Sequence, residues 1–169
     1  MHTPPLIIAL LSQMVVPLSI GTPAPPLLID DWIRGSPLTQ FEPDTIYVIE
    51  FFATWCSPCK KMTPTLMQIS EAYRGRKVEV IGVASAERAP TRDAAVAAVA
   101  SWVADHAPNI NYRIAVDYSH KTDALWRVPW FPYIVIVDGR GSIAATPLPF
   151  QLPRILPKII DDRPHYSDQ

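Results

Sequence analysis

Residues 46–60 read IYVIEFFATWCSPCK and carry the strongest structural signal in the chain. The first seven form a continuous β-branched and aromatic run, which predicts a buried central strand. Cys56 and Cys59, the two cysteines of the 169-residue chain, follow directly. Beyond them, apolar residues recur at helical spacing as far as Gly75, which predicts a helix that begins at the cysteine pair.

Strands and helices alternate on the C-terminal side of this segment. Strand patterns recur at 78–84, 112–116 and 133–137. Helical patterns recur at 93–107, at 119–127 and, interrupted by two prolines, at 151–162. Turn residues predict two hairpins, one N-terminal at 27–39 and one at 133–146. This order predicts an α/β fold, with a central mixed β-sheet, helices on both faces and an N-terminal β-hairpin extension.

Length and composition fit a single domain. Of the residues, 49% are hydrophobic and 18% are charged, as in ordinary folded proteins. We expect the domain at 19–163, an extension at 1–18 and a tail at 164–169. Residues 6–18 are mostly apolar but too few to span a bilayer, so 1–18 is either a signal-like segment or a plain extension. The net charge of −1 argues against a nucleic-acid partner, and we expect a monomer without a stable membrane span.

The cysteine pair has the spacing of a redox centre. Unpaired backbone N–H groups at a helix N-terminus stabilise an anion and so favour the thiolate, which is the nucleophilic form of cysteine. Cys56, nearer the start of the helix, is predicted to attack a substrate disulfide. Cys59, within the first turn, is predicted to resolve the mixed disulfide. Pro58 suits the first helical turn because it lacks an N–H that the helix would leave unpaired there.

Three alternatives to a redox centre stay open for the pair. It could be half of a zinc site, although no second cysteine pair exists and the four histidines, His2, His106, His120 and His165, lack ligand spacing. It could be an inert structural disulfide, although so small a loop constrains the unfolded chain very little. A chance Cys-x-x-Cys is the third alternative.

The flanking residues resemble a known family. Residues 51–60, Phe-Phe-Ala-Thr-Trp-Cys-Ser-Pro-Cys-Lys, are similar to the active-site segment of thioredoxins, and in particular of the TlpA/ResA-like thiol–disulfide oxidoreductases. Glu50 stands where that family often has a buried acid, Pro64 where its active-site helix is kinked, and Pro132 where it has a cis-proline. Residues 21–25, Gly-Thr-Pro-Ala-Pro, resemble its N-terminal signature. The resemblance spans roughly residues 20–146 and implies a thioredoxin-like fold.

The resemblance also implies roles for individual residues. A buried Glu50 would have a raised pKa and could accept the proton of Cys59, whereas the alternative is an exposed glutamate without a role. Pro132 would lie against the cysteines, and the backbone of Phe131 would pair with an extended substrate. The alternative is a trans-proline that begins a strand. We thus expect Cys56, Cys59, Glu50 and Pro132 to be catalytic.

Aromatic residues near the cysteines suggest a substrate-docking surface. Trp55, Trp130 and Phe131, together with Pro58, are predicted to form an apolar rim that binds protein substrates, although tryptophan is equally common in protein cores. The family commonly has a small residue where Trp130 stands and threonine where Tyr133 stands. These two departures bear on which substrates fit.

The leading hypothesis is a protein-disulfide reductase. It would work through the redox-active Cys56–Cys59 disulfide without a metal or organic cofactor, and would exchange electrons with a second protein. A thiol peroxidase would require proline and a hydroxyl residue where Ile49 and Ala53 stand. A redox-inactive binding or chaperone module is the third hypothesis. The family resemblance favours an extracytoplasmic location, with a cytoplasmic one left open, and the sequence does not decide whether the protein reduces or oxidises its clients.

Overall fold

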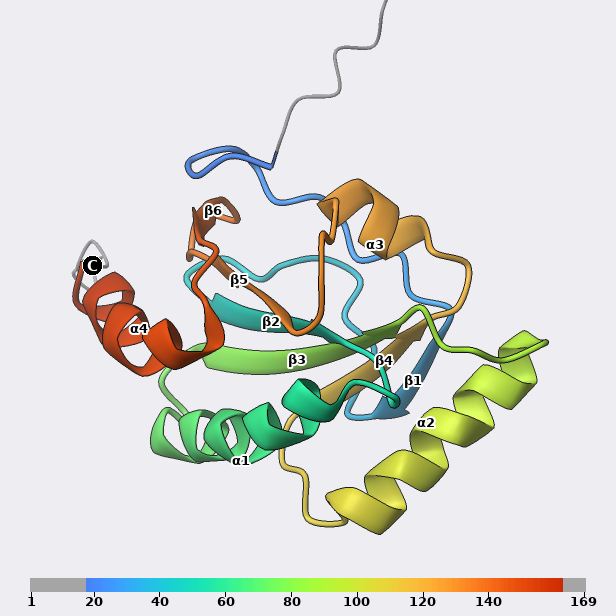
Figure 1. The fold of residues 1–169 in the computed structure, drawn as a ribbon. Coiled ribbons are helices and arrows are strands. Elements are labelled where there is room, and N and C mark those ends of the chain that lie inside the picture. Colours follow the sequence, from blue (N-terminus) through green and yellow to red (C-terminus); the bar gives the residue numbers. More distant parts are fainter. Residues whose placement is uncertain (1–17, 163–169) are drawn as a thin grey trace, which may run out of the picture.

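A computed structural model of the protein describes residues 18–162 (Figure 1). The strands are β1 (Asp31–Arg34), β2 (Ile46–Phe52), β3 (Val78–Ser85), β4 (Arg113–Asp117), β5 (Tyr133–Val137) and β6 (Ile143–Ala145). The helices are α1 (Ser57–Ala72), α2 (Arg92–His106), α3 (Lys121–Trp126) and α4 (Leu152–Asp161), the last preceded by a 3-10 turn at Pro149–Gln151. Residues 1–17 and 163–169 lie outside the described part of the chain. The predicted N-terminal extension and C-terminal tail therefore fall outside it, and the predicted domain boundaries fall at its ends.

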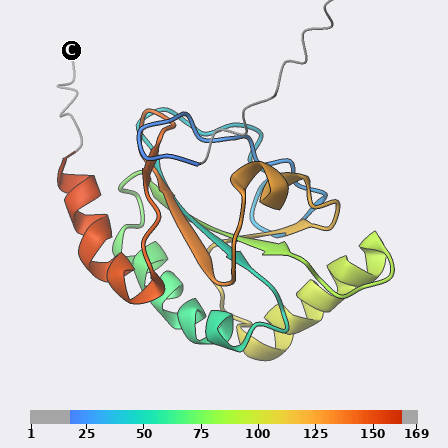
Figure 2. The same ribbon diagram turned by 45° about the horizontal axis from the view of Figure 1, so that its top comes forward.

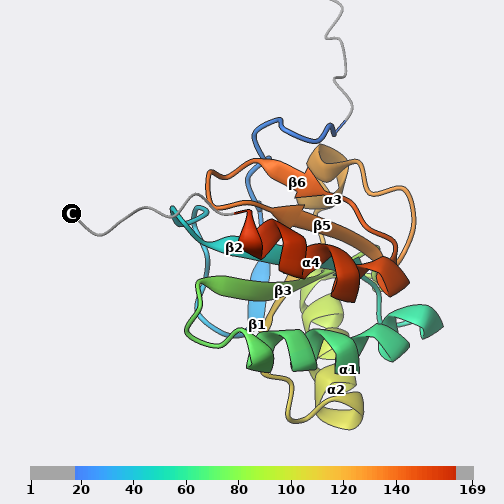
Figure 3. The same ribbon diagram turned by 90° about the vertical axis from the view of Figure 1, so that its left-hand side faces the viewer.

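Within the described residues, the strands form one mixed sheet in the order β1-β4-β3-β2-β5-β6. The three central strands, β2, β3 and β4, are parallel, because α1 and α2 return the chain between them. β5 pairs antiparallel with β2, and β6 with β5, so 133–146 form the hairpin that the turn residues predict. Figure 3 shows β6, β5, β2 and β3 side by side in this order.

The sheet separates two hydrophobic cores. Alternate residues of a strand point to opposite faces, and β2 contributes to both because it is buried along its whole length. One core contains Ile46, Val48 and Phe52 together with residues of α1, α2 and α4. The other contains Tyr47, Ile49 and Phe51 with Trp126 of α3, and the segment 18–41 packs against it. Figures 1 and 2 show α1, α2 and α4 on one side of the sheet and α3 on the other.

The predicted helix ends agree with the local chemistry. Thr91 caps α2, since its side chain accepts a hydrogen bond from the backbone N–H of Ala94 at 3.2 Å. Pro58 lies in the first turn of α1 and Pro153 in that of α4, where the missing N–H has no intrahelical partner to lose. Pro64 and Pro157 are accommodated inside the same helices.

The predicted N-terminal hairpin is wrong. β1 pairs with the distant strand β4, not with a second strand after the turn, and 35–43 contain no strand. Gly35 does take a positive φ of 79°, as a turn would require. The turn packs instead against Arg113, whose Cγ would lie 2.7 Å from a side-chain carbon at Gly35. The open edge of β4 offers β1 a partner, while 36–41 continue over the core on the α3 side of the sheet.

Candidate active site

Cys56 and Cys59 form a disulfide at the start of α1. The S–S distance is 2.04 Å, and the two Cα atoms lie 5.3 Å apart. Both residues are buried, with exposed fractions of 4% for Cys56 and 1% for Cys59, so Cys56 is the more accessible of the two. The strand-to-helix placement that the sequence predicts is therefore confirmed.

Cys56 is the N-cap of α1. Its backbone is extended, with φ −82° and ψ 102°, and its sulfur accepts a hydrogen bond from the backbone N–H of Cys59 at 3.3 Å. The first turn of α1 carries no acidic residue, and Lys60 follows Cys59 directly. The positive end of the helix dipole and this backbone donor both face the sulfur, which favours a thiolate at Cys56 once the disulfide is reduced.

Glu50 lies on the face of the sheet that α1 covers. It shares that face with Val48 and Phe52, and 2% of it is exposed. Burial raises the pKa of Glu50 from 4.5 to about 8, and in the described part of the chain its Oε1 has no hydrogen-bond partner. The alternative of an exposed glutamate is wrong. Its role as a proton acceptor stays a prediction.

Two polar side chains accompany Glu50. Burial raises the pKa of Tyr112, and the charge of Glu50 raises it further, while a hydrogen bond with the Thr63 side chain lowers it. Gly82 pairs in register with Glu50, and a side-chain carbon there would lie 2.9 Å from Cδ1 of Ile114 and 3.2 Å from Cε1 of Phe52. The hydroxyl of Thr63 donates a hydrogen bond to the carbonyl of Cys59 at 3.4 Å. Thr63 therefore links the surroundings of the buried acid to the cysteine helix.

Pro132 is a cis-proline, as the resemblance implies. The Phe131–Pro132 peptide bond is cis, so the alternative of a trans-proline is wrong. Pro132 is buried and directly precedes β5, whose first residue, Tyr133, pairs with Phe51 of β2. The ring of Phe131 meets that of Trp55 edge to face, with centroids 5.9 Å apart. The cis-proline segment thus lies beside the residue that precedes Cys56.

The predicted rim residues lie at the surface near the disulfide. Trp55 is 45% exposed and Trp130 is 55% exposed, while Phe131 is half-buried and Pro58 is exposed. Trp130 packs edge to face on Tyr133, with ring centroids 5.9 Å apart. Neither of these two tryptophans is a core residue, in contrast to Trp102 and Trp126, which are. Their role in substrate docking stays a prediction.

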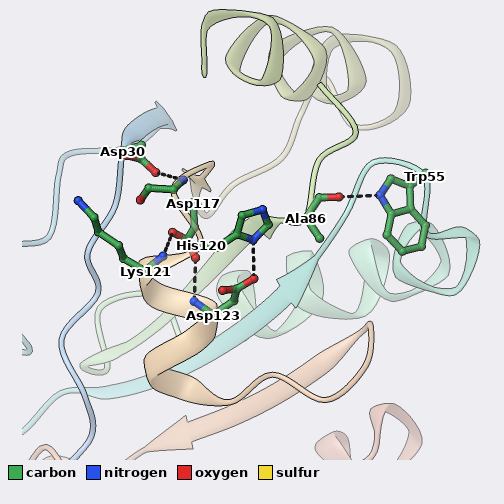
Figure 4. A network of polar contacts seen from close by, with 8 residues as sticks. Asp30, Trp55, Ala86, Asp117, His120, Lys121 and Asp123 are labelled. Carbon is green, nitrogen blue, oxygen red and sulfur yellow. Dashed lines mark hydrogen bonds and ion pairs between the residues drawn. The ribbon is translucent and has the colours of Figure 1, made fainter. Parts of the chain in front are cut away.

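Sequence reasoning missed a second loop at the site, residues 86–88. The carboxylate of Glu87 accepts two hydrogen bonds from Thr54, at 2.7 Å from its backbone N–H and at 2.5 Å from its hydroxyl. The indole N–H of Trp55 donates to the carbonyl of Ala86 at 3.0 Å (Figure 4). The guanidinium of Arg88 lies 4.5 Å from the centroid of the Trp55 ring.

A usable signal for this loop was present in the sequence. Thr54 and Glu87 each stand two residues beyond a buried strand, and the two strands are neighbouring and parallel. Polar residues that follow adjacent parallel strands meet at the same edge of the sheet, where α/β proteins bind their ligands.

A third strand end carries a buried aspartate with a structural role. Asp117 ends β4, and its carboxylate accepts hydrogen bonds from the backbone N–H groups of Lys121 at 3.1 Å and Asp123 at 2.7 Å (Figure 4). Burial raises the pKa of Asp117, and backbone donors at the start of α3 oppose that rise in part.

Nowhere in residues 18–162 do three or more His, Cys, Asp or Glu side chains gather as metal ligands. The same residues contain no helix long and apolar enough to cross a membrane.

Known redox proteins resemble this chain in sequence. The thioredoxin family model matches residues 38–99. Protein FixW of Rhizobium leguminosarum is 36% identical over 152 residues, which cover 88% of this chain and 69% of FixW. The thiol–disulfide oxidoreductase ResA of Bacillus cereus is 23% identical over 128 residues, which cover 75% of this chain and 68% of ResA.

The chain belongs to the thioredoxin-like redoxin family.

Solved structures share the fold of this redoxin. A thiol-disulfide isomerase from Corynebacterium glutamicum superposes with a TM-score of 0.67 at 21% identity, covering 82% of this chain and 97% of that one. An uncharacterized conserved protein from Geobacillus kaustophilus superposes with a TM-score of 0.72 at 14% identity, covering 90% of this chain and 87% of that one. Together with the disulfide at the start of α1, the family makes this redoxin a thiol–disulfide oxidoreductase whose reacting pair is Cys56 and Cys59.

Proposed function

We propose that this redoxin is a reductase of disulfide bonds in protein clients. The observation that carries the proposal is the position of the Cys56–Cys59 disulfide, at a helix N-terminus directly after the half-exposed Trp55, whose ring contacts Phe131 of the cis-proline bond. The redox-active group is the disulfide itself, without a metal or organic cofactor. A second protein returns the pair to its dithiol form.

The proposed reaction has two exchange steps. The Cys56 thiolate attacks one sulfur of the client disulfide, which releases the other sulfur as a thiolate and leaves a mixed disulfide. Cys59 then loses its proton and attacks the Cys56 sulfur, which closes the Cys56–Cys59 disulfide and frees the second client thiol. Two electrons pass from the pair to the client, whose two sulfurs leave as thiolates and take up protons from solvent. Glu50, buried on the same side of the sheet, is the proposed acceptor of the Cys59 proton.

The aromatic rim supports a protein client over a small molecule. Trp55 and Trp130 expose apolar area, and the ring of Trp55 contacts that of Phe131, which follows Trp130 in the chain. Aromatic side chains dominate the energetics of protein interfaces. Thiol–disulfide oxidoreductases of the ResA type among its relatives support an extracytoplasmic site of action, and we propose that the protein acts there as a monomer.

Two measurements test the direction of exchange. With dithiothreitol as electron donor, the protein should reduce the interchain disulfides of insulin, and Cys56→Ser should abolish this activity. Its reduction potential against glutathione should lie below roughly −230 mV, toward the value of thioredoxin. A potential near about −120 mV, typical of strong oxidants, would contradict the proposal even if exchange itself were observed.

A further inference from the structure

Loop 86–88 holds the residues that precede Cys56 in one arrangement. Glu87 binds both donors of Thr54, and the carbonyl of Ala86 binds the indole of Trp55. Ala86 takes a left-handed backbone, with φ 57°, a conformation that is unfavourable for an L-residue. The hydrogen bonds of the loop to Thr54 and Trp55 offset this cost and join the loop to the cysteine segment as one connected unit.

Arg88 is the charged side chain that this unit presents to solvent. It is exposed, and its guanidinium stacks on the half-exposed ring of Trp55 at 4.5 Å. In the described residues no carboxylate pairs with it, because the adjacent Glu87 is engaged with Thr54. Other arginines do pair with acidic side chains, namely Arg74, Arg92, Arg113 and Arg140.

Stacking leaves the binding capacity of Arg88 intact. A guanidinium that lies over an aromatic face keeps its in-plane N–H groups available, and their fork matches a carboxylate. The indole that carries it is fixed by its own hydrogen bond to Ala86, so less side-chain entropy is lost when a ligand binds. Lys60, exposed and next to Cys59, adds a second positive charge, and no acidic residue lies between Thr54 and Lys60.

We propose that Arg88 is a specificity-determining residue that selects client segments with a carboxylate close to the reacting cysteine. This inference rests on the proposed function, because it names the clients of the same site. A client cysteine bonded to Cys56 lies next to Trp55, and an extended chain advances about 3.3 Å per residue. The carboxylate that Arg88 binds therefore stands within about two residues of the client cysteine.

The test uses a pair of peptides that differ in one residue. Each contains one disulfide and carries either aspartate or lysine two residues from the same cysteine. Since the charge also changes the intrinsic reactivity of the peptide, each rate is divided by the rate of reduction with dithiothreitol alone. The corrected ratio of kcat/KM, aspartate peptide over lysine peptide, should be about fivefold for the parent at low salt, as for exposed charge pairs, and should fall as salt is added.

Variants of Arg88 identify the source of this preference. Arg88→Lys should keep part of the preference for the aspartate peptide. Arg88→Gln should lower the corrected kcat/KM ratio by the part of the preference that Arg88 supplies, and Arg88→Glu should shift the ratio toward the lysine peptide. Arg76→Gln is the matched control, because Arg76 stacks on Tyr73 at the other end of α1, 5.4 Å from the ring centroid. It should keep the parent ratio.

The outcomes separate the inference from the proposed function. An equal ratio in the parent and in Arg88→Glu overturns the inference while reduction of both peptides leaves the proposed function standing. A ratio that changes as much in Arg76→Gln as in Arg88→Gln also overturns it, because the effect would then be one of overall charge. Failure of the parent to reduce insulin as well as both peptides refutes the proposed function, and the inference falls with it, whereas reduction of insulin but of neither peptide overturns the inference alone.

Discussion

Two helices of this protein start at the same edge of the sheet, and their first turns are capped by different chemistry. α1 follows β2, and its cap is the sulfur of Cys56, which accepts one backbone N–H at 3.3 Å. α3 follows β4, and its start is held by the buried carboxylate of Asp117, which accepts two backbone N–H groups at 3.1 and 2.7 Å (Figure 4).

The sulfur cap of α1 is the reactive cap, because it takes part in disulfide exchange. The carboxylate cap of α3 is the inert cap, because it only holds its helix. A carboxylate is a strong acceptor whose bonds persist, so Asp117 holds the first turn of α3 throughout the reaction cycle. Sulfur is a weak acceptor, and the sulfur of Cys56 must also change its bonding in every cycle of exchange. Stability at the start of α1 therefore comes from its neighbours, namely loop 86–88 through Thr54 and Trp55 and the cis-proline segment through Phe131.

Removal of the resolving sulfur should have the largest effect. Cys59→Ser leaves Cys56 able to attack but removes the intramolecular second step, so turnover of a protein disulfide should fall about 100-fold or more. The mixed disulfide with the client should accumulate and be visible by mass spectrometry without reductant. Cys56→Ser is the control and should trap nothing. Trapping by the control variant alone would reverse the roles of the two cysteines.

Neutralising the buried acid should slow one step by a smaller factor. In the parent, the release of client from the mixed disulfide should speed up as pH rises and level off above about 8, because the carboxylate form of Glu50 accepts the proton. In Glu50→Gln this step should be about tenfold slower at pH 8, less than the about 100-fold or more typical of a general base because water can accept the proton in its place, with the first attack nearly unchanged. Stopped-flow mixing resolves the two steps. Equal release rates would remove Glu50 from the mechanism.

The same variant also tests the burial of Glu50 through stability. Its folded pKa of about 8 lies above the ordinary 4.5, so the folded state keeps a proton that the unfolded chain releases. The free energy of unfolding should therefore fall as pH rises, by about 3 kcal/mol between pH 4.5 and pH 7. Glu50→Gln lacks this titration, and denaturant unfolding at both pH values should show a smaller fall.

At the inert cap the effect should be on stability and not on chemistry. Asp117→Ala leaves two backbone N–H groups of α3 without their acceptor, which should lower the free energy of unfolding by about 2 kcal/mol. Turnover per folded molecule should stay at the parent value. Asp117→Asn retains one acceptor oxygen and should lose about half as much stability. A large loss of turnover in folded Asp117→Ala would show that the two strand ends are coupled.

Local sequence pattern was enough for most of the fold and for the reacting pair. The apolar run before Cys56 identified β2, helical spacing identified α1, and the turn at 138–141 identified the β5–β6 hairpin. Each of these signals lies within a few residues of the element it predicts. The N-terminal hairpin was mispredicted because the partner of β1 is β4, more than 70 residues away, and no local pattern encodes that pairing.

The sequence by itself determined the strand-to-helix junction with its two cysteines, because their spacing along the chain fixes their spacing in the first turn of α1. Only the tertiary structure decided the environment of that pair. The desolvation of Glu50 depends on a complete sheet and on α1 above it, and the contacts of loop 86–88 with Thr54 and Trp55 depend on the register of β2 and β3. Burial and register are properties of the packed chain, so side chains more than 30 residues apart acquire their chemistry only when the sheet forms.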